Sequence, residues 1–263
     1  MKKIVIMGAS SGIGYACAEA LAKRGVKVGL AARHTKPLEE LQRKYPEQVQ
    51  YARIDVTKPT AGGQLEALIA KLGGMDIYFH VAGIGYENTS LDPEAEVAIF
   101  NTNTLGFVRC ICTAYRYFRN NHIRGHIAAI TSVAGTNGLA RLSAYSASKA
   151  AGQKWLVALE QLSNNSDAGI TFSDIRPGWI RTPLLVPGNK YPMTMSLEYA
   201  VPRILKAIVR KQRVAVIDWR WNIVVGMWRL IPNALWTHLN IPVSEPDVSL
   251  QQRKPDDSDP ESA

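Results

Sequence analysis

The segment Lys3-Ile-Val-Ile-Met-Gly-Ala-Ser-Ser-Gly-Ile-Gly14 joins a short apolar run to a glycine-rich turn. The apolar run at residues 3–7 predicts a buried strand, and the pattern of residues 16–23 predicts a helix soon after the turn. Glycines at positions 8, 12 and 14 let the backbone turn tightly and approach a ligand closely. Because the free amides of a helix N-terminus favour negative charge, this arrangement is typical of a pyrophosphate site.

Alternating strands and helices continue along the chain. Further strands are predicted at residues 26–31, 48–54, 76–81, 125–130, 170–175 and 214–217, with helical patterns between them. This order predicts an α/β fold with a single Rossmann-type, doubly wound parallel sheet of seven strands and helices on both faces. With 263 residues and 46% apolar content, the chain can bury one sizeable core.

Changes in composition divide the chain into three regions. We expect a dinucleotide-binding domain at residues 1–218, which includes a proline-rich substrate loop at 183–196. A tryptophan-rich amphipathic extension is expected at residues 219–243. Residues 244–263 carry acids, prolines and serines but almost no large apolar side chains, so they predict a disordered acidic tail.

The net charge of +9 hides an asymmetry. The last twenty residues hold six acids and two bases, a charge of −4, so residues 1–243 carry +13. A basic body suits anionic partners such as nucleotide phosphates or acidic lipid. Since no nucleic-acid motif accompanies the charge, we expect no nucleic acid partner.

Three cysteines and the N-terminal residues bear on the compartment. Cys17, Cys110 and Cys112 match no metal-ligand spacing, so we expect no metal and free, reduced thiols. The apolar run at residues 4–7 is too short for the core of a signal peptide. We therefore expect a cytoplasmic protein.

A second segment, Ser143-Ala-Tyr-Ser-Ala-Ser-Lys149, begins another predicted helix. Tyr145 and Lys149 are four residues apart and so share one helical face. A free phenol has a pKa of about 10 and exchanges protons poorly at neutral pH. An ammonium about 4 Å away contributes on the order of 4 kcal/mol at an effective dielectric of ~20, enough to lower that pKa by roughly three units. The pair predicts a phenol that acts as an acid or base, and an ordinary helix with an exposed Tyr and Lys is the alternative.

Other polar residues follow predicted strands. Ser132 comes at the carboxyl end of strand 125–130, where ligands bind in an open parallel sheet. Arg33 stands just past the second strand, where a guanidinium suits the 2′-phosphate of NADP, and a solvated surface arginine is the alternative. Asp55 ends the third strand, where its carboxylate can accept from an adenine amino group. Asn103 and Gly106 lie in the helical pattern of residues 93–118, and the glycine predicts close packing or a local distortion.

In this order the motifs resemble the short-chain dehydrogenase/reductase family, in its single-domain, NADP(H)-dependent branch. The matching features are Gly8-x-x-x-Gly12-x-Gly14, Asp55-Val56, Asn103-x-x-Gly106, Ser132, Tyr145-x-x-x-Lys149, and Pro177-Gly178 followed by Thr182. They span about residues 3 to 217. The resemblance implies an enzyme, an oxidoreductase that transfers a hydride between a nicotinamide cofactor and a carbonyl or alcohol.

The resemblance also implies a role for each catalytic residue. Tyr145 would deliver or remove the proton of the substrate oxygen, and Ser132 would hydrogen-bond that same oxygen. Lys149 would lower the pKa of Tyr145 and bond the nicotinamide ribose, and Asn103 would hold a water that links Lys149 to solvent. Ser132 and Tyr145 would contact the substrate. The loop 183–195 is rich in proline and in bulky apolar side chains, so its residues Leu184 and Leu185 suit a lid over an apolar substrate, and leucines that cap the core are the alternative.

A larger set of residues is implied to bind the cofactor, with NADP(H) preferred and NAD(H) as the alternative. These residues are Gly8, Ser10, Ser11, Gly12, Ile13, Gly14, Arg33, Asp55, Val56, Ala82, Gly83, Tyr145, Lys149, Pro177, Gly178, Ile180 and Thr182.

One segment departs from the family pattern. The family usually has Asn-Ala-Gly after the fourth strand, whereas this chain has His80-Val81-Ala82-Gly83. Bracing of the sheet beneath the cofactor must then come from elsewhere. We interpret His80 as a hydrogen-bonded structural histidine, with a titrating residue in the site as the alternative.

The sequence is compatible with three functions. The first is reduction of a carbonyl, or oxidation of the alcohol, of an apolar lipid-like or steroid-like substrate. The second is reduction of carrier-bound 3-oxoacyl chains. The third is a non-catalytic, membrane-associated scaffold that binds NADP. We also expect a homo-oligomer, a dimer or tetramer, because paired subunits are usual for the resembled family.

Residues 219–241 hold four of the six tryptophans among aliphatic residues. Arg220, Arg229 and Pro232 interrupt this segment, so it falls short of the ~20 apolar residues that span a bilayer. Tryptophan with arginine suits the membrane interface, which predicts a peripheral membrane contact. A helix packed on the core and a surface for a partner subunit are the alternatives.

Overall fold

The computed structural model describes residues 2–185, 189–239 and 241. Within these residues, seven parallel strands form one sheet in the order β3-β2-β1-β4-β5-β6-β7. The strands are β1 (Lys3–Met7), β2 (Lys27–Ala32), β3 (Val49–Arg53), β4 (Ile77–His80), β5 (His126–Ile130), β6 (Thr171–Pro177) and β7 (Val214–Ile217). Strand order reverses between β1 and β4, and a ligand crevice is expected at the carboxyl ends beside this point. The predicted doubly wound fold is confirmed.

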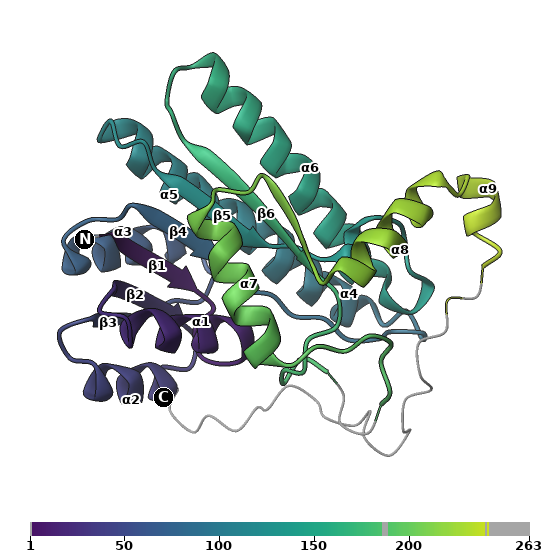
Figure 1. Ribbon diagram of the computed structural model, residues 1–263, viewed down its shortest axis with the longest axis horizontal. Helices are drawn as coiled ribbons and strands as arrows, with labels where there is room; N and C mark the ends of the chain where they lie inside the picture. The colour runs from purple at the N-terminus through teal and green to yellow at the C-terminus, as the bar shows by residue number, and fades with distance from the viewer. Residues whose placement is uncertain (1, 186–188, 240, 242–263) are drawn as a thin grey trace.

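Helices cover both faces of the sheet (Figure 1). Side chains alternate across β1, with Ile4 and Ile6 on one face and Val5 and Met7 on the other. The first face is covered by α1 (Gly12–Ala22), α2 (Lys36–Lys44), α7 (Leu197–Val209) and α8 (Trp219–Leu230). The second face is covered by α3 (Ala61–Leu72), α5 (Phe107–Asn120) and α6 (Ser143–Asn165). The strands are apolar on both sides because both sides are buried.

The glycine turn between β1 and α1 is as tight as its sequence predicts. Gly8 has a φ of +92°, and a Cβ on Gly14 would lie 2.0 Å from the carbonyl oxygen of Gly8. A side chain at Gly14 would therefore push the turn apart. The helix begins at Gly12, earlier than the predicted start at residue 16, because the glycines of its first turn carry no apolar side chains to reveal the helical period.

The helical pattern predicted at residues 93–118 is not one regular helix. A π-helix at Asn101–Gly106 separates α4 (Pro93–Phe100) from α5. Gly106 lies in this π-helix, and a Cβ there would lie 2.7 Å from Cγ2 of Val56. Both predicted roles of the glycine, a distortion and close packing, are present.

The helices α8 and α9 (Asn233–Trp236) of the tryptophan-rich extension lie at one end of the molecule (Figure 1), where Trp228 and Trp236 pack with Leu139 and Leu142. Trp228 packs edge-to-face against Trp221 of α8 and against Trp236 of α9, with ring centroids 6.2 and 5.3 Å apart. Nε1 of Trp236 donates to the carbonyl of Gly138 at 2.7 Å. The inner face of α8, with Trp221 and Val225, is buried in the core. The alternative of a helix packed on the core is therefore confirmed for this face.

The outer face of α8 is exposed, and Trp219, Ile223, Met227 and Leu230 recur on it at helical spacing. Within residues 2–185, 189–239 and 241, no helix has both the length and the apolar character to cross a bilayer. The boundaries of the extension stay a prediction, and the predicted tail at 244–263 lies outside the described residues.

Candidate active site

A cavity of about 660 Å³ opens at the carboxyl ends of the strands. Every predicted cofactor and substrate residue lines it except Gly14. Of the predicted catalytic residues, Ser132, Tyr145 and Lys149 line it, whereas Asn103 does not. The sheet and α6 therefore bring together residues that lie more than a hundred positions apart in the chain.

Tyr145 and Lys149 project from the first two turns of α6 into this cavity. Lys149 Nζ lies 5.6 Å from the centroid of the Tyr145 ring, within cation–π range. It also donates to the carbonyl oxygen of Ile130 at the end of β5, at 3.1 Å. The Tyr145 ring packs on Gly85, where a Cβ would lie 2.5 Å from Cδ2 of the ring. The phenol is thus held between α6 and the loop after β4.

Ser132 follows β5 and faces the phenol. Its hydroxyl accepts from the backbone N–H of Ala134 at 3.1 Å and donates to the carbonyl of Pro177 at 3.4 Å. Ser132 also shares a hydrogen bond with the phenol of Tyr145. One hydroxyl and one phenol therefore point to the same region of the cavity.

The electrostatics of the pair differ from the sequence prediction. Burial lowers the pKa of Lys149 to about 8, and the charge of Asp174 opposes this change. Burial raises the pKa of Tyr145, and a hydrogen bond with Ser132 only partly offsets this rise. The pKa of Tyr145 is therefore raised in this site and not lowered as expected, because the phenol is buried. The role of Lys149 in stabilising the phenolate stays a prediction.

Asn103 braces the loop after β4. Its Oδ1 accepts from the backbone N–H of Ile84, and its Nδ2 donates to the carbonyl of Ile84, both at 2.8 Å. Nδ2 also lies 3.2 Å from Oγ of Ser148. Val81 stands where the family usually has a bracing Asn. Asn103 of the π-helix supplies part of that bracing here. The water relay assigned to Asn103 stays a prediction.

His80 is fully buried at the end of β4. Its Nδ1 lies 2.9 Å from the hydroxyl of Tyr78, and its ring meets Phe107 edge-on with centroids 4.9 Å apart. Burial, with a smaller contribution from the Lys149 charge, lowers its pKa to about 3. The imidazole is neutral near pH 7, so its interpretation as a structural residue agrees with the structure and a titrating role does not.

Arg33 and Asp55 form the opposite end of the cavity, beyond β2 and β3. Arg33 is exposed. Asp55 Oδ1 accepts from the backbone N–H and the hydroxyl of Thr57 at 2.9 and 2.8 Å. Burial alone would raise the pKa of Asp55, but these bonds and the Arg33 charge lower it overall. The hydrogen-bonded carboxylate of Asp55 and the exposed guanidinium of Arg33 thus lie where the adenosine part of the cofactor is predicted to bind.

The extension supplies cavity walls that the sequence did not reveal. Trp221, Val224 and Trp228 of α8, together with Ile241, line the cavity at the end away from Arg33. Trp179 packs against Tyr191 beside them, with ring centroids 4.7 Å apart. The cluster of four tryptophans in residues 219–241 was the sequence feature that could have indicated these walls. Composition alone, however, does not show which face of the helix is buried.

The predicted substrate loop contributes to the same region. Leu184 and Leu185 line the cavity, and Met193 lies further along the loop on the same wall. A β-bridge between Ile180 and Met195 closes the base of the loop. Residues 186–188 of the loop lie outside the described residues. Among the residues described, no group of three or more His, Cys, Asp or Glu side chains could hold a metal ion.

Comparison with known proteins gives consistent results. A family model described as short chain dehydrogenase matches residues 2–191. An uncharacterized oxidoreductase of Myxococcus xanthus is 31% identical over 88% of this chain and 93% of its own length. Farnesol dehydrogenase of Aedes aegypti is 31% identical over 70% of this chain and 79% of its own. A solved short-chain type dehydrogenase/reductase from Mycobacterium marinum is 26% identical, covers 84% of this chain and 95% of its own, and has a TM-score of 0.73.

Proposed function

Because this chain belongs to the short-chain dehydrogenase/reductase family and is therefore an oxidoreductase, we propose that it reduces the carbonyl of an apolar, lipid-like or steroid-like substrate with NADPH, or oxidises the corresponding alcohol. The observation that carries this proposal is the convergence of Tyr145, Ser132 and Lys149 at one end of β5, in a cavity whose far wall is apolar.

The residues of the cavity fit a nicotinamide dinucleotide. The glycine turn has no room for a Cβ at Gly14, and Gly83 lies so close to the catalytic helix that a Cβ on it would be 3.3 Å from Lys149 Nζ. Such bare backbone lets a pyrophosphate and a ring approach closely. When bound, a nicotinamide supplies or accepts the hydride.

The proton is handled by side chains of this chain. Tyr145 donates its phenolic proton to the carbonyl oxygen as negative charge develops there. The Ser132 hydroxyl donates a hydrogen bond to the same oxygen and so stabilises that charge. Lys149, as a cation within 5.6 Å of the ring centroid, stabilises the phenolate that remains.

The walls of the cavity favour an apolar substrate. Besides the tryptophans of α8, Leu139 and Leu142 line the same end. One relative is named for farnesol, an apolar alcohol. A 3-oxoacyl chain on a carrier is the second candidate, favoured by the basic charge of residues 1–243. A non-catalytic scaffold is disfavoured because Ser132, Tyr145 and Lys149 are all present.

A substrate panel tests the proposal directly. Steroid ketones, isoprenoid aldehydes and 3-oxoacyl thioesters are offered with NADPH, and the loss of NADPH absorbance is followed. We expect the highest kcat/KM with a bulky apolar ketone or aldehyde. Turnover of the 3-oxoacyl thioesters alone favours the second candidate, and NADPH binding with no turnover across the panel favours the scaffold.

Arg33 is proposed to select NADP(H) over NAD(H). Arg33→Ala is expected to raise the KM for NADPH about 10- to 100-fold, because a charge-assisted hydrogen bond to the 2′-phosphate is lost. The KM for NADH should stay the same. Arg53, exposed at the end of β3 but absent from the cavity lining, provides the control substitution Arg53→Ala. Equal KM values for NADPH in the wild type and in Arg33→Ala contradict this proposal.

The outer face of α8 is proposed to contact membrane. Trp219 and Leu230 are 66% and 82% exposed, and Arg229 is exposed beside them. Large apolar side chains with flanking arginine suit the headgroup region of an anionic bilayer. The inner face of the same helix lines the substrate cavity, so an apolar substrate dissolved in the bilayer would have a short route to the site.

Replacing Trp219 and Leu230 together by Ser is expected to lower binding to phosphatidylcholine vesicles that contain phosphatidylserine about tenfold or more, because each buried apolar side chain contributes about 1.5–3 kcal/mol. Vesicle pelleting measures this. Point changes are required, because truncation before α8 also removes the cavity wall. Val209→Ser, at a position 69% exposed on α7, is the control. Unchanged pelleting of the double variant rules the contact out.

A second apolar surface is proposed as the contact between copies of this chain. Val97 and Phe100 of α4, Leu105 of the π-helix, and Val157 and Leu162 of α6 are all exposed. Single apolar side chains on a surface are ordinary, but several on neighbouring helices favour association. Light scattering should give the mass of a dimer or tetramer, and a monomer mass contradicts this proposal.

A further inference from the structure

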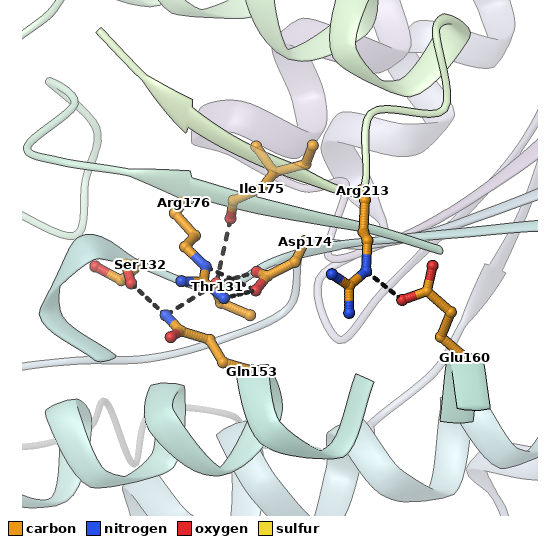
Figure 2. Close-up of polar contacts among 8 residues, drawn as sticks. All are labelled: Thr131, Ser132, Gln153, Glu160, Asp174, Ile175, Arg176 and Arg213. Carbon is orange, nitrogen blue, oxygen red and sulfur yellow. Dashed lines mark hydrogen bonds and ion pairs between the residues drawn. The ribbon is translucent and has the colours of Figure 1, made fainter. Parts of the chain in front are cut away.

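Three consecutive residues at the carboxyl end of β5, Ile130, Thr131 and Ser132, are each held by a different polar contact. Figure 2 shows the contacts of Thr131 and Ser132. The carbonyl of Ile130 accepts from Lys149. The hydroxyl of Thr131 donates to Oδ1 of Asp174, and the carbonyl of Ser132 accepts from Nε2 of Gln153 at 2.7 Å. The N–H of Thr131 donates to the carbonyl of Ile175 and makes the last backbone bond from β5 to β6. The three contacts therefore hold the backbone at the point where the sheet ends.

Gln153 belongs to the same stripe of α6 as the catalytic pair. Tyr145, Lys149 and Gln153 are spaced by four residues, so all three face the end of β5. Nε2 of Gln153 also lies 3.5 Å from the hydroxyl of Thr131. One amide therefore ties the helix that carries the phenol to the backbone that carries the serine.

A buried ion pair anchors the other side of this network. Asp174 and Arg176 of β6 are 4% and 7% exposed. Oδ2 of Asp174 accepts from Nε and Nη2 of Arg176 at 2.7 and 2.6 Å, while Oδ1 accepts from Thr131 (Figure 2). A buried ion pair is often no more stable than apolar residues of similar size. Stability alone therefore does not account for these charges beneath the site.

We propose that Thr131, Gln153 and the Asp174–Arg176 pair are positioning residues, which fix the backbone of Ser132 so that its hydroxyl meets the phenol of Tyr145. This inference rests on the proposed function. None of the four residues supplies a reacting group: they act through Ser132 and, electrostatically, through Lys149.

The charge on Asp174 gives the network a second effect. The titratable or charged groups around Lys149 are Tyr145 on its own helix, neutral His80 on β4, and Asp174 with its partner Arg176 on β6. Asp174 raises the pKa of Lys149 against the effect of burial. Removing the carboxylate, which leaves Arg176 unpaired, should make Lys149 lose its proton at a lower pH.

Thr131→Val and Thr131→Ser test the positioning role, because Val keeps the shape of Thr while Ser keeps its hydroxyl. We expect Thr131→Val to lower kcat about tenfold or more with the KM for NADPH unchanged, since small misplacements of catalytic groups are costly. Thr131→Ser should stay within about threefold of the wild type. Equal kcat in the wild type and Thr131→Val, or equal losses in both variants, overturns the proposal.

Asp174→Asn adds a readout that does not need the substrate. NADPH affinity should fall as pH rises through about 8 in the wild type, and this midpoint should move to lower pH in Asp174→Asn. The control is Glu160→Gln, which removes the partly exposed ion pair of Glu160 with Arg213, 2.5 Å long (Figure 2). A midpoint that is the same in Asp174→Asn and in the wild type overturns the electrostatic part. If the wild type binds NADPH with this midpoint but reduces no carbonyl, the proposed function fails instead.

Discussion

Tyr145→Phe is expected to lower kcat about 10²- to 10⁴-fold, the range that a positioned general acid contributes, while NADPH affinity changes less than about twofold. The ring should keep its place, because it packs on Gly85 so closely that a Cβ there would lie 2.5 Å away. Only the proton donor is removed. Single-turnover NADPH oxidation measures the chemical step, and quenching of tryptophan fluorescence measures cofactor affinity.

Tyr86→Phe is the matched control for this substitution. Tyr86 also lines the cavity, but its hydroxyl donates to the carbonyl of Ala95 at 3.0 Å. We expect kcat to stay within about threefold of the wild type, because the lost bond is an exposed one. If Tyr145→Phe turns over as fast as the wild type, the phenol is not the proton donor.

Lys149→Met is expected to change activity and stability in opposite directions. Turnover should fall at least about 10²-fold, because the phenolate loses its cation. The free energy of unfolding at pH 7 should rise by up to about 3 kcal/mol, because the fold holds the lysine proton with a pKa of about 8 instead of 10.5. Methionine fills similar space without a buried charge.

The stability difference has a defined pH window. The unfolded chain binds the lysine proton more tightly than the fold does, so the wild type recovers the lost stability as pH rises from about 8 to 10.5. The advantage of Lys149→Met should therefore be largest at neutral pH and vanish near pH 10.5. Urea unfolding at several pH values measures it, with exposed Lys154→Met on the same helix as the control. A wild type as stable as Lys149→Met at pH 7 contradicts the prediction.

The fold could be predicted from the sequence because its signals are local. Each strand is a short apolar run, and the glycine turn after β1 sets the position of the first helix. Helix ends were less certain, since the π-helix at Asn101–Gly106 interrupts the helical pattern of residues 93–118 for only six residues. The i→i+5 backbone bonds that define it leave no mark on the apolar pattern, and the close contact of Gly106 with Val56 joins residues distant in sequence.

The candidate site was predictable to the extent that motifs mark it. The spacing of Tyr145 and Lys149 predicts that they share one helical face, but it does not predict that both are buried. Burial raises the pKa of Tyr145 and lowers the pKa of Lys149. Gln153 follows the same spacing, yet a glutamine has many uses on a helix. The role of Trp221 as a cavity wall depends on a fold-back of α8 that composition alone does not determine.

The bond from Trp236 to the carbonyl of Gly138 has a consequence for protein synthesis. The ribosome makes Ser132, Tyr145 and Lys149 before it makes α8 and α9. A nascent or prematurely terminated chain that stops before residue 219 would carry the whole proton-transfer apparatus but lack one wall of its substrate chamber. We expect such a fragment to bind an apolar ketone poorly, because Trp221 and Trp228 line that chamber.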